Sequence, residues 1–215
     1  VSNVNRRVME KSVKVEDYSS LSLNMRLYGG SIGVPFMPTK SLLGSDLEFK
    51  PGFKGEGKSK AVDCPFTGEI VSLMPSINPD IGVIVAQKVG EDGTVQIDDG
   101  LGMDLDGLRA SEIKIVIAEE IVSEDKIRKE TQKNVLPGIF VDFVVQISHG
   151  AYPTALFGYY DYDEENLRDY LKWSTSESGF EKYRKKWIKK SEADLVGRMS
   201  PKKKGELKAD TKLGY

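Results

Sequence analysis

The sequence predicts an α/β protein built on a layered sheet. Short apolar runs that suit buried strands alternate with segments whose apolar residues recur at helical spacing. Prolines and glycines separate the two kinds of segment, as expected where turns join strands to helices. At 215 residues the chain is long enough for one substantial core, so alternation of this kind favours helices packed on a sheet.

Two helices are predicted to open the chain. Ser2 is a favourable N-cap residue for the first, in which Val4 and Val8 fall on one face. Gly29 and Gly30 suit the end of the second, because glycine readily leaves the helical conformation. These signals predict helices over residues 3–11 and 19–27, with an extended piece at 13–15.

Strands are predicted through the middle of the chain. Pro35 and Pro38 keep residues 33–45 from being helical, and a surface loop rich in Gly, Lys and Glu follows at 50–63. The turn Gly90–Gly93 predicts a hairpin. Strands are predicted over 70–74, 81–86, 94–97, 113–118 and 139–147, with short helices over 101–108 and 123–129.

The last part of the chain is predicted to be an aromatic turn followed by helices. Asp163 suits the N-cap of a helix that continues through Leu171, and a further helix is expected over 178–189. We therefore expect an α/β domain over residues 1–190 and a C-terminal tail over 191–215.

Composition excludes several classes of function. The net charge of −2 gives no drive toward nucleic acid or an anionic membrane, and no apolar run has the length of a membrane span. A single cysteine, Cys64, rules out an internal disulfide, and with the single histidine, His149, it cannot form a zinc site of the usual Cys/His kind. We expect a soluble, cytoplasmic protein without a metal.

One loop matches the phosphate-binding pattern GxxxxGK[ST] letter for letter, at residues 52–59. Its flanks oppose that function, since Pro51 precedes the loop and Pro65 blocks the helix that should follow. We interpret the segment as a solvated loop, and nucleotide binding rests on this motif alone.

Other reactive residues have simpler interpretations. Glu177 stands in a Ser-Glu-x-Gly setting that suits a nucleophile, but the segment also suits a linker with a helix N-cap at Ser178. His149 suits a general base or, more simply, the anchor of a turn. The basic run at 184–190 suits a solvated helix face with Trp187 toward the core. The residues alone therefore assign no activity.

Six short segments stand out by their order along the chain. They are the acidic-Tyr-Ser element at 16–19, the Pro-Phe stretch at 33–47, CPFTGE at 64–69, the segment 79–87, HGAYP at 149–153 and GYYDYD at 158–163. Together they resemble the A-type (alpha) subunits of class I coenzyme A transferases of the glutaconate type. The likeness covers nearly all of residues 1–188.

The chain also departs from that family. Val85 replaces the usual histidine before Ala-Gln, and Tyr152 replaces the histidine of a Gly-Ala-His-Pro element. The family's N-terminal strands, with a glycine-rich element, would lie before Val1. The resemblance thus implies an α/β/α open sheet that lacks these strands, supplied by another chain or by a longer precursor.

The resemblance implies a covalent mechanism that begins on another chain. A glutamate of the B-type partner attacks an acyl-CoA thioester, so the A-type chain needs no nucleophile of its own. No cofactor is bound permanently, because the coenzyme A thioester is a substrate. The A-type chain completes the cleft and binds substrate through residues at loops and element ends, for which we propose Ser2, Asn3, Ser41, Gly44, Ser45 and Gln87.

Two alternatives remain beside the transferase. A CoA-thioester hydrolase of the same fold, of the ring-cleavage type, would use a carboxylate of this chain, and Glu16 is the candidate. A truncated relative without catalysis would serve as an interaction module. The sequence identifies neither the acyl group nor the acceptor, which suit a dicarboxylate, a 3-oxo acid or a larger ring-derived acid.

Overall fold

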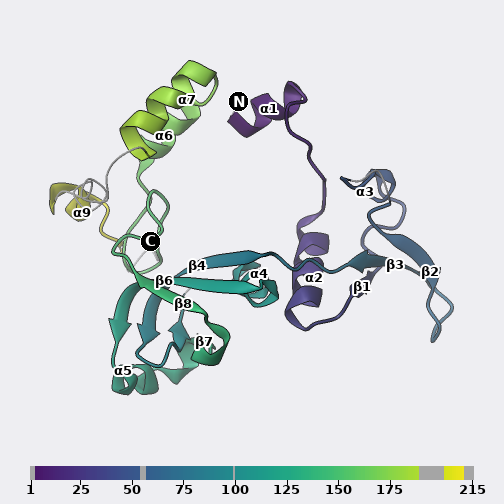
Figure 1. The fold of residues 1–215 in the computed structure, drawn as a ribbon, viewed down its shortest axis with the longest axis horizontal. Coiled ribbons are helices and arrows are strands. Elements are labelled where there is room, and N and C mark those ends of the chain that lie inside the picture. Colours follow the sequence, from purple (N-terminus) through teal and green to yellow (C-terminus); the bar gives the residue numbers. More distant parts are fainter. Residues whose placement is uncertain (1–2, 54–56, 99, 189–200, 211–215) are drawn as a thin grey trace. The chain divides into compact units, whose positions relative to one another are not determined.

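The computed structural model describes residues 3–53, 57–98, 100–188 and 201–210. The chain divides into two compact units. Figure 1 labels most of their helices and strands. We call Val15–Ser148 the sheet unit, and Val1–Lys14 with His149–Tyr215 the terminal unit. The mixed α/β fold is confirmed. The proposed boundary at residue 190 stays a prediction, since residues 189–200 lie outside the described ranges.

The sheet unit is centred on a five-stranded sheet of order β7-β5-β4-β6-β8. Its members are β4 (Ile81–Gly90), β5 (Val95–Gln96), β6 (Ile113–Val122), β7 (Asn134–Leu136) and β8 (Phe143–Gln146). Strands β4, β6 and β8 run parallel, while β5 returns antiparallel to β4. The predicted hairpin is confirmed, because Gly90 N donates to Thr94 O at 2.8 Å across the turn.

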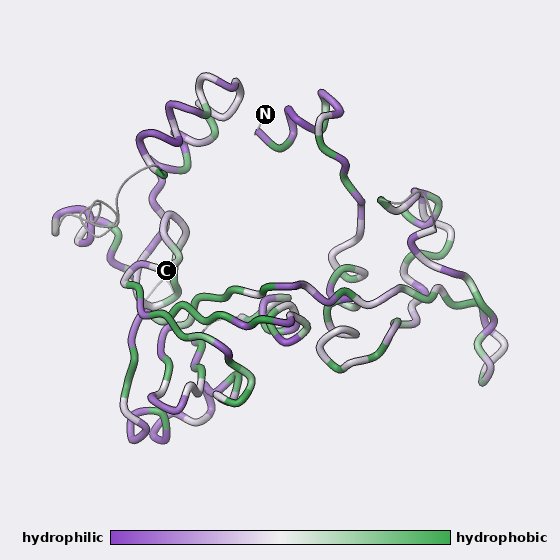
Figure 2. Tube along the Cα trace, in the orientation of Figure 1, coloured by the Kyte–Doolittle hydropathy of each residue, from purple (hydrophilic) through white to green (hydrophobic). Residues whose placement is uncertain are grey.

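One face of this sheet carries the core. Ile84 and Ala86 of β4 pair in register with Val116 and Ala118 of β6, and all four are buried. Helix α4 (Asp104–Ala110) packs on them through Leu108, and β4, β6 and β8 are predominantly hydrophobic along their length (Figure 2). Burial of these side chains stabilises the unit by about 1.5–3 kcal/mol for each large aliphatic group.

The longest predicted strand is shorter than expected. Only Phe143–Gln146 form β8, whereas Gly138–Phe140 form a 3₁₀ turn, η2. Gly138 lies against the backbone of Asp92, where a side chain would collide with the carbonyl oxygen. The chain turns at this crossing before it enters the sheet, so the apolar run 139–147 is divided between two conformations. The helices at 101–108 and 123–129 are confirmed as α4 and α5 (Glu124–Lys129), with shifted ends.

A second, three-stranded antiparallel sheet has the order β1-β3-β2. Its strands are β1 (Phe36–Thr39), β2 (Lys60–Asp63) and β3 (Ile70–Pro75), and the short helix α3 (Asp46–Phe49) lies between β1 and β2 in the chain. Part of the predicted loop 50–63 is thus strand β2. Helix α2 (Ser20–Ser31) contacts both this sheet and α4.

Helix α2 does not stop at its glycine pair. Ser19 is the N-cap and accepts a hydrogen bond from Ser22 N at 3.1 Å, but the helix runs through Gly29 and Gly30 to Ser31. Gly29 lies against Ser76 and Met37, and Gly30 against the carbonyl oxygen of Ile77. The two glycines therefore allow close packing. The helix ends at Ser31, and Gly33 just beyond it has a φ of +74°, which suits a residue without a Cβ.

The terminal unit is helical. Its elements are α1 (Asn3–Met9), α6 (Glu164–Trp173), α7 (Glu177–Tyr183), a π-helical turn η3 (Arg184–Ile188) and α9 (Pro201–Glu206). Ser176, not the predicted Ser178, caps α7, because its hydroxyl accepts from Gly179 N at 3.1 Å. Lys202–Lys204 lie in α9. Among the described residues, every helix is too short or too polar to cross a bilayer.

The carboxylate of Asp163 holds this unit together. It caps α6 as predicted, and it also accepts from Tyr152 Oη at 2.7 Å and Lys203 Nζ at 3.0 Å. Burial alone would raise the pKa of Asp163, but the hydrogen bonds from Tyr152 and Lys203 outweigh it and lower that pKa. One carboxylate thus joins α6, the turn before it and α9.

Replacement of Gly30 tests the close packing of α2. We expect Gly30→Ala to lower the free energy of unfolding by about 2–3 kcal/mol, because the added Cβ meets the Ile77 carbonyl and lies 2.8 Å from Asn78 Oδ1. Gly107→Ala in α4 is the matched control. Its Cβ meets nothing nearer than Leu27 Cδ1 at 3.8 Å, so it should be neutral or stabilising by about 0.5–1 kcal/mol. Urea unfolding followed by circular dichroism measures both.

Replacement of Asp163 tests the terminal unit. Asp163→Ala should destabilise this unit by about 2–4 kcal/mol, since it removes a helix cap and leaves Tyr152 and Lys203 without their shared acceptor. Both tryptophans, Trp173 and Trp187, lie in this unit, so tryptophan fluorescence during urea unfolding reports on it. Glu164→Gln, which removes only an exposed pair with Arg168, should cost less than about 0.5 kcal/mol.

The same network sets a pH dependence. Because the folded pKa of Asp163 is lowered, its stabilising effect is complete above the unfolded value near 4 and is lost as the pH falls through the lower folded value. Wild-type fluorescence midpoints should therefore fall below about pH 4 more steeply than those of Asp163→Ala. Parallel pH profiles of the two proteins would contradict the assignment.

Candidate functional site

The predicted substrate-binding residues are divided between the two units. Asn3 belongs to the terminal unit, where its side-chain oxygen accepts from Arg6 Nη2 at 2.8 Å. Ser41, Gly44, Ser45 and Gln87 belong to the sheet unit. Ser2 lies outside the described residues. The assignment of all six as binding residues stays a prediction.

The turn between β1 and α3 carries three of these residues. It is anchored by Leu42, which is 2% exposed, and Ser45 Oγ donates to the Leu42 carbonyl at 2.7 Å. Gly44, at φ +72°, donates its N–H to Glu48 at 2.8 Å. Ser41 is exposed and accepts from Thr39 Oγ1 at 3.0 Å. The local bonds hold the turn in one shape and leave the Ser41 hydroxyl at the surface.

Gln87 lies near the carboxyl end of β4 and is 1% exposed. Its side-chain oxygen accepts from Asp98 N at 3.3 Å, which fixes the amide. The carboxyl ends of parallel strands are where ligands usually bind in α/β sheets. On β6, Glu119 stands near the same end and accepts from Ser148 Oγ at 3.2 Å.

Beside Gln87 lies a balanced group of charges. Lys88 pairs with Glu130 at 3.0 Å, and Lys133 pairs with Glu130 at 2.6 Å and with Asp98 at 3.1 Å. The hydrogen bonds from Lys133 and Lys88 lower the pKa of Glu130. Two ammonium groups meet two carboxylates, so the charges of this group balance.

A second group of charges surrounds Tyr18, just before α2. The phenol donates to Glu16 Oε1 at 3.0 Å, and the Arg26 guanidinium carbon lies 4.4 Å from the ring centroid. Burial raises the pKa of Tyr18 to about 12, against the opposing charge of Arg26. The Asp17 carboxylate accepts a hydrogen bond from Lys50 Nζ at 2.6 Å. The carboxylate of Glu16, the candidate of the hydrolase alternative, thus accepts a hydrogen bond from the Tyr18 hydroxyl.

Lys58 of the GxxxxGK[ST] loop also belongs to this group. The prediction that the loop is solvated is wrong for this residue. The residue is 4% exposed, its Nζ donates to the Asp17 carbonyl at 2.5 Å, and Nζ lies 4.9 Å from the Tyr18 ring centroid. Strand β2 follows Ser59, where a phosphate-binding loop requires a helix. The predicted absence of a helix after the loop is thus confirmed, whereas the predicted exposure of the loop is wrong at Lys58, which is buried.

The remaining candidates have structural surroundings. His149, at φ 60°, stacks on Tyr160 with ring centroids 4.5 Å apart and occupies a turn, as expected. Glu177 begins α7 and pairs with Arg6 and Arg7 at 3.8 and 3.7 Å. Among the residues that the structure describes, no group of three His, Cys, Asp or Glu side chains suits a metal ion.

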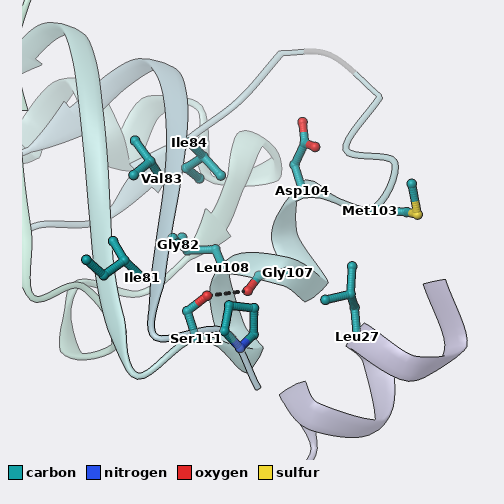
Figure 3. Close-up of a pocket in the computed structure, with 11 residues that line it drawn as sticks. Leu27, Ile81, Gly82, Val83, Ile84, Met103, Asp104, Gly107, Leu108 and Ser111 are labelled. Carbon is teal, nitrogen blue, oxygen red and sulfur yellow. Dashed lines mark hydrogen bonds between the residues drawn. The ribbon is translucent and has the colours of Figure 1, made fainter. Parts of the chain in front are cut away.

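A surface pocket of about 340 Å³ lies between α2, β4 and α4 (Figure 3). Its lining is largely apolar, with Leu27 from α2 and Ile81–Ile84 from β4, and Asp104 adds a carboxylate. Ile81 begins β4, so the pocket stands at the amino end of the strand, opposite the end that bears Gln87. It contains none of the predicted binding residues.

Sequence reasoning missed the Tyr18 group. Glu16 and Tyr18 are close in the sequence, but Arg26 and Lys58 reach the ring from a helix and from a loop that sequence analysis placed in solvent. A lysine within a glycine-rich polar loop gives no signal of burial. Only the packing of the loop against Asp17 and Tyr18 shows it.

Comparison with known proteins gives consistent matches. The family model described as coenzyme A transferase matches residues 2–146. The A subunit of glutaconate CoA-transferase from Acidaminococcus fermentans is 34% identical over 232 aligned residues, which cover 100% of this chain and 72% of that protein. The A subunit of 3-oxoadipate CoA-transferase from Pseudomonas knackmussii is 32% identical over 75% of this chain and 54% of its own length.

The crystal structure of glutaconate coenzyme A-transferase from Acidaminococcus fermentans superposes with a TM-score of 0.92. The superposition covers 100% of this chain and 72% of that one, at 32% identity. The α/β fold that the resemblance to this family implied is therefore confirmed.

Titration of Tyr18 tests the cluster. The pKa of Tyr18 is higher in the folded protein than in the unfolded chain. Its neutral phenol therefore stabilises the fold fully below the unfolded pKa of about 10, and this stabilisation is lost as the pH rises toward about 12. Tyr18→Phe should melt below wild type at pH 8, and the difference should shrink toward pH 11. The melting temperature by circular dichroism measures this. Tyr28→Phe, at an exposed position on α2, is the control variant.

Proposed function

This chain belongs to the coenzyme A transferase family, and on that premise we propose that it is the A-type subunit of a heteromeric CoA transferase. The enzyme moves coenzyme A from an acyl-CoA to a free carboxylic acid. The observation that carries the proposal is the 34% identity to the A subunit of glutaconate CoA-transferase along the whole of this chain. Both named relatives are the A subunits of CoA-transferases.

The proposed reaction uses a glutamate of the B-type subunit. Its carboxylate attacks the thioester carbonyl and expels the CoA thiolate, which forms an acyl-glutamyl anhydride. The thiolate attacks the glutamyl carbonyl, releases the first acid and leaves a glutamyl-CoA thioester. The acceptor carboxylate attacks that thioester and again expels the thiolate. Attack of the thiolate on the acceptor's carbonyl then gives the new acyl-CoA and regenerates the glutamate.

This chain would bind and orient the reactants. The exposed Ser41 hydroxyl and the ordered Gly44–Ser45 backbone suit hydrogen bonds to a carboxylate or a thioester oxygen. Asn3 and Gln87 are already held by neighbours, as a preorganised donor or acceptor requires. The proposed roles of these residues, and of Ser2, rest on the family resemblance and on this local order.

An exposed apolar face supports association with a partner. On the sheet face opposite the core, Val83 aligns with Ile115 and Phe143, and Ile117 aligns with Val145. Val83 and Phe143 are 54% and 58% exposed. Exposed apolar surface on adjacent strands favours burial against another surface. The B-type subunit is the partner proposed here, and a cytoplasmic location stays a prediction.

A hydrolase of the same fold is the second candidate. The observation that favours it is the hydrogen bond from Tyr18 Oη to Glu16, which orients a carboxylate of this chain. In that reaction Glu16 would take a proton from water as the water attacks the thioester carbonyl, and free acid and CoA would leave. Glu16 has no required part in the transferase.

Isolation of the complex separates these proposals. The tagged chain is purified from its native cells, co-purifying chains are identified, and the complex is assayed with acyl-CoA and free dicarboxylic, 3-oxo and ring-derived acids. A B-type partner with exchange of CoA between acids supports the transferase. Release of CoA without exchange supports the hydrolase. A chain that purifies alone without either activity would contradict both.

Substitution of Glu16 gives the residue-level prediction. In a transferase, Glu16→Gln should keep the exchange rate within about twofold, since the nucleophile lies on the partner. In a hydrolase the same change should lower kcat by about 10²–10⁴-fold, the usual contribution of a general base. Glu10→Gln, which removes a carboxylate paired locally with Arg6, is the control.

A further inference from the structure

The hydroxyl of Thr39 joins the end of β1 to the turn that carries Ser41. Thr39 is the last residue of β1 and is 9% exposed. Its Oγ1 accepts a hydrogen bond from Ser41 N at 3.0 Å and donates one to Ser41 Oγ, also at 3.0 Å. One side chain thus holds both the backbone and the hydroxyl of Ser41.

The three-stranded sheet fixes the position of the Thr39 side chain. Thr39 lies opposite Ser72 of β3, and directly opposite residues of an antiparallel pair share one face of the sheet. Both residues are buried, so this is the covered face. Leu42, which follows Ser41 in the chain, is 2% exposed and anchors the turn. A strand before Ser41 and a buried leucine after it therefore confine the serine.

The direction of the hydrogen bonds leaves Ser41 as a donor. A serine hydroxyl has one proton and two acceptor lone pairs. Because Thr39 donates to Ser41 Oγ, their bond occupies a lone pair and leaves the Ser41 proton for another acceptor. Ser41 is exposed, and within the part of the chain that the structure describes its proton has no acceptor. A hydroxyl that already accepts a hydrogen bond is also polarised as a donor.

The other serine of this turn differs in this respect. Ser45 Oγ donates to the Leu42 carbonyl at 2.7 Å, so its proton is used within the turn. Its hydroxyl helps to shape the turn, whereas that of Ser41 can reach a molecule in the solvent.

We propose that Thr39 is a positioning residue of the transferase reaction, which holds the Ser41 hydroxyl ready to donate to an oxygen of the substrate. Two substrate oxygens suit this donor. One is the thioester carbonyl oxygen, which gains negative charge when the partner's carboxylate attacks, and the other is a carboxylate oxygen of the acid. A donor that is fixed in advance stabilises such charge without reorganisation. The inference rests on the proposed function, in which Ser41 binds substrate.

A double-mutant cycle in the co-purified complex tests this role. Thr39→Val keeps a β-branched residue in β1 but removes the hydroxyl, so it should lower kcat/KM for CoA exchange by about tenfold. Thr39→Ser keeps the hydroxyl and should stay within about threefold of wild type. Ser41→Ala should cost at least as much as Thr39→Val. Added to Ser41→Ala, Thr39→Val should lower kcat/KM by less than about twofold, because the hydroxyl that it positions is already gone.

Ser72→Ala is the matched control. It removes a buried hydroxyl that lies directly opposite Thr39 and has no hydrogen-bond partner among the described residues. We expect kcat/KM to change by less than about twofold. Thermal unfolding followed by circular dichroism checks that each variant is folded.

The two kinetic constants identify the substrate oxygen. A lower kcat with an unchanged KM supports the thioester oxygen, since the bond then forms only in the transition state. A higher KM for the acid with an unchanged kcat supports its carboxylate.

Two results overturn the positioning role. One is wild-type kinetics of Thr39→Val, and the other is an equal effect of Thr39→Val with and without the Ser41 hydroxyl, as a purely structural role would give. Exchange by the wild-type complex is measured first. Its absence overturns the proposed function and this role with it, whereas the other two failures leave the proposed function standing.

Discussion

The parallel pairing of β4 with β6 is the constraint on which the sheet unit depends. Ile84 lies beside Val116 and Ala86 beside Ala118, so each strand buries the same face. The alanines and Gly82 let α4 lie close, since a Cβ at Gly82 would stand 3.1 Å from the Leu108 backbone. Parallel strands also bring their carboxyl ends to one edge, which places Gln87 and the carboxylate of Glu119 near that edge.

In two groups of charges in this unit, ion pairs and hydrogen bonds compensate the cost of burial. Beside Gln87, Lys88 and Lys133 meet the carboxylates of Glu130 and Asp98, and these charges balance. Around Tyr18, Lys50 pairs with the Asp17 carboxylate, and the most buried cation, Lys58, donates to the Asp17 carbonyl. Desolvation makes a buried charge costly unless hydrogen bonds or an opposite charge compensate it.

Some sequence signals were misinterpreted because one residue type serves two purposes. Gly29 and Gly30 suit a helix end, yet here they permit contact with Met37 and the Ile77 carbonyl within a continuing helix. The GxxxxGK[ST] loop matches a phosphate-binding pattern and looks solvated, yet its lysine is buried against Tyr18. In both cases a partner distant in sequence decides the outcome.

The sequence by itself determined the α/β class, most strands and helices, the cap at Asp163 and, through the order of its short segments, the family. These depend on local periodicity, capping chemistry and similarity, which are all present in the linear chain. Only the tertiary structure decided the burial of Lys58, the hold of Tyr18 on Glu16 and the joining of Tyr152 and Lys203 by Asp163. Most of these contacts join residues from separate elements, and their energies depend on how much water the fold excludes around each charge.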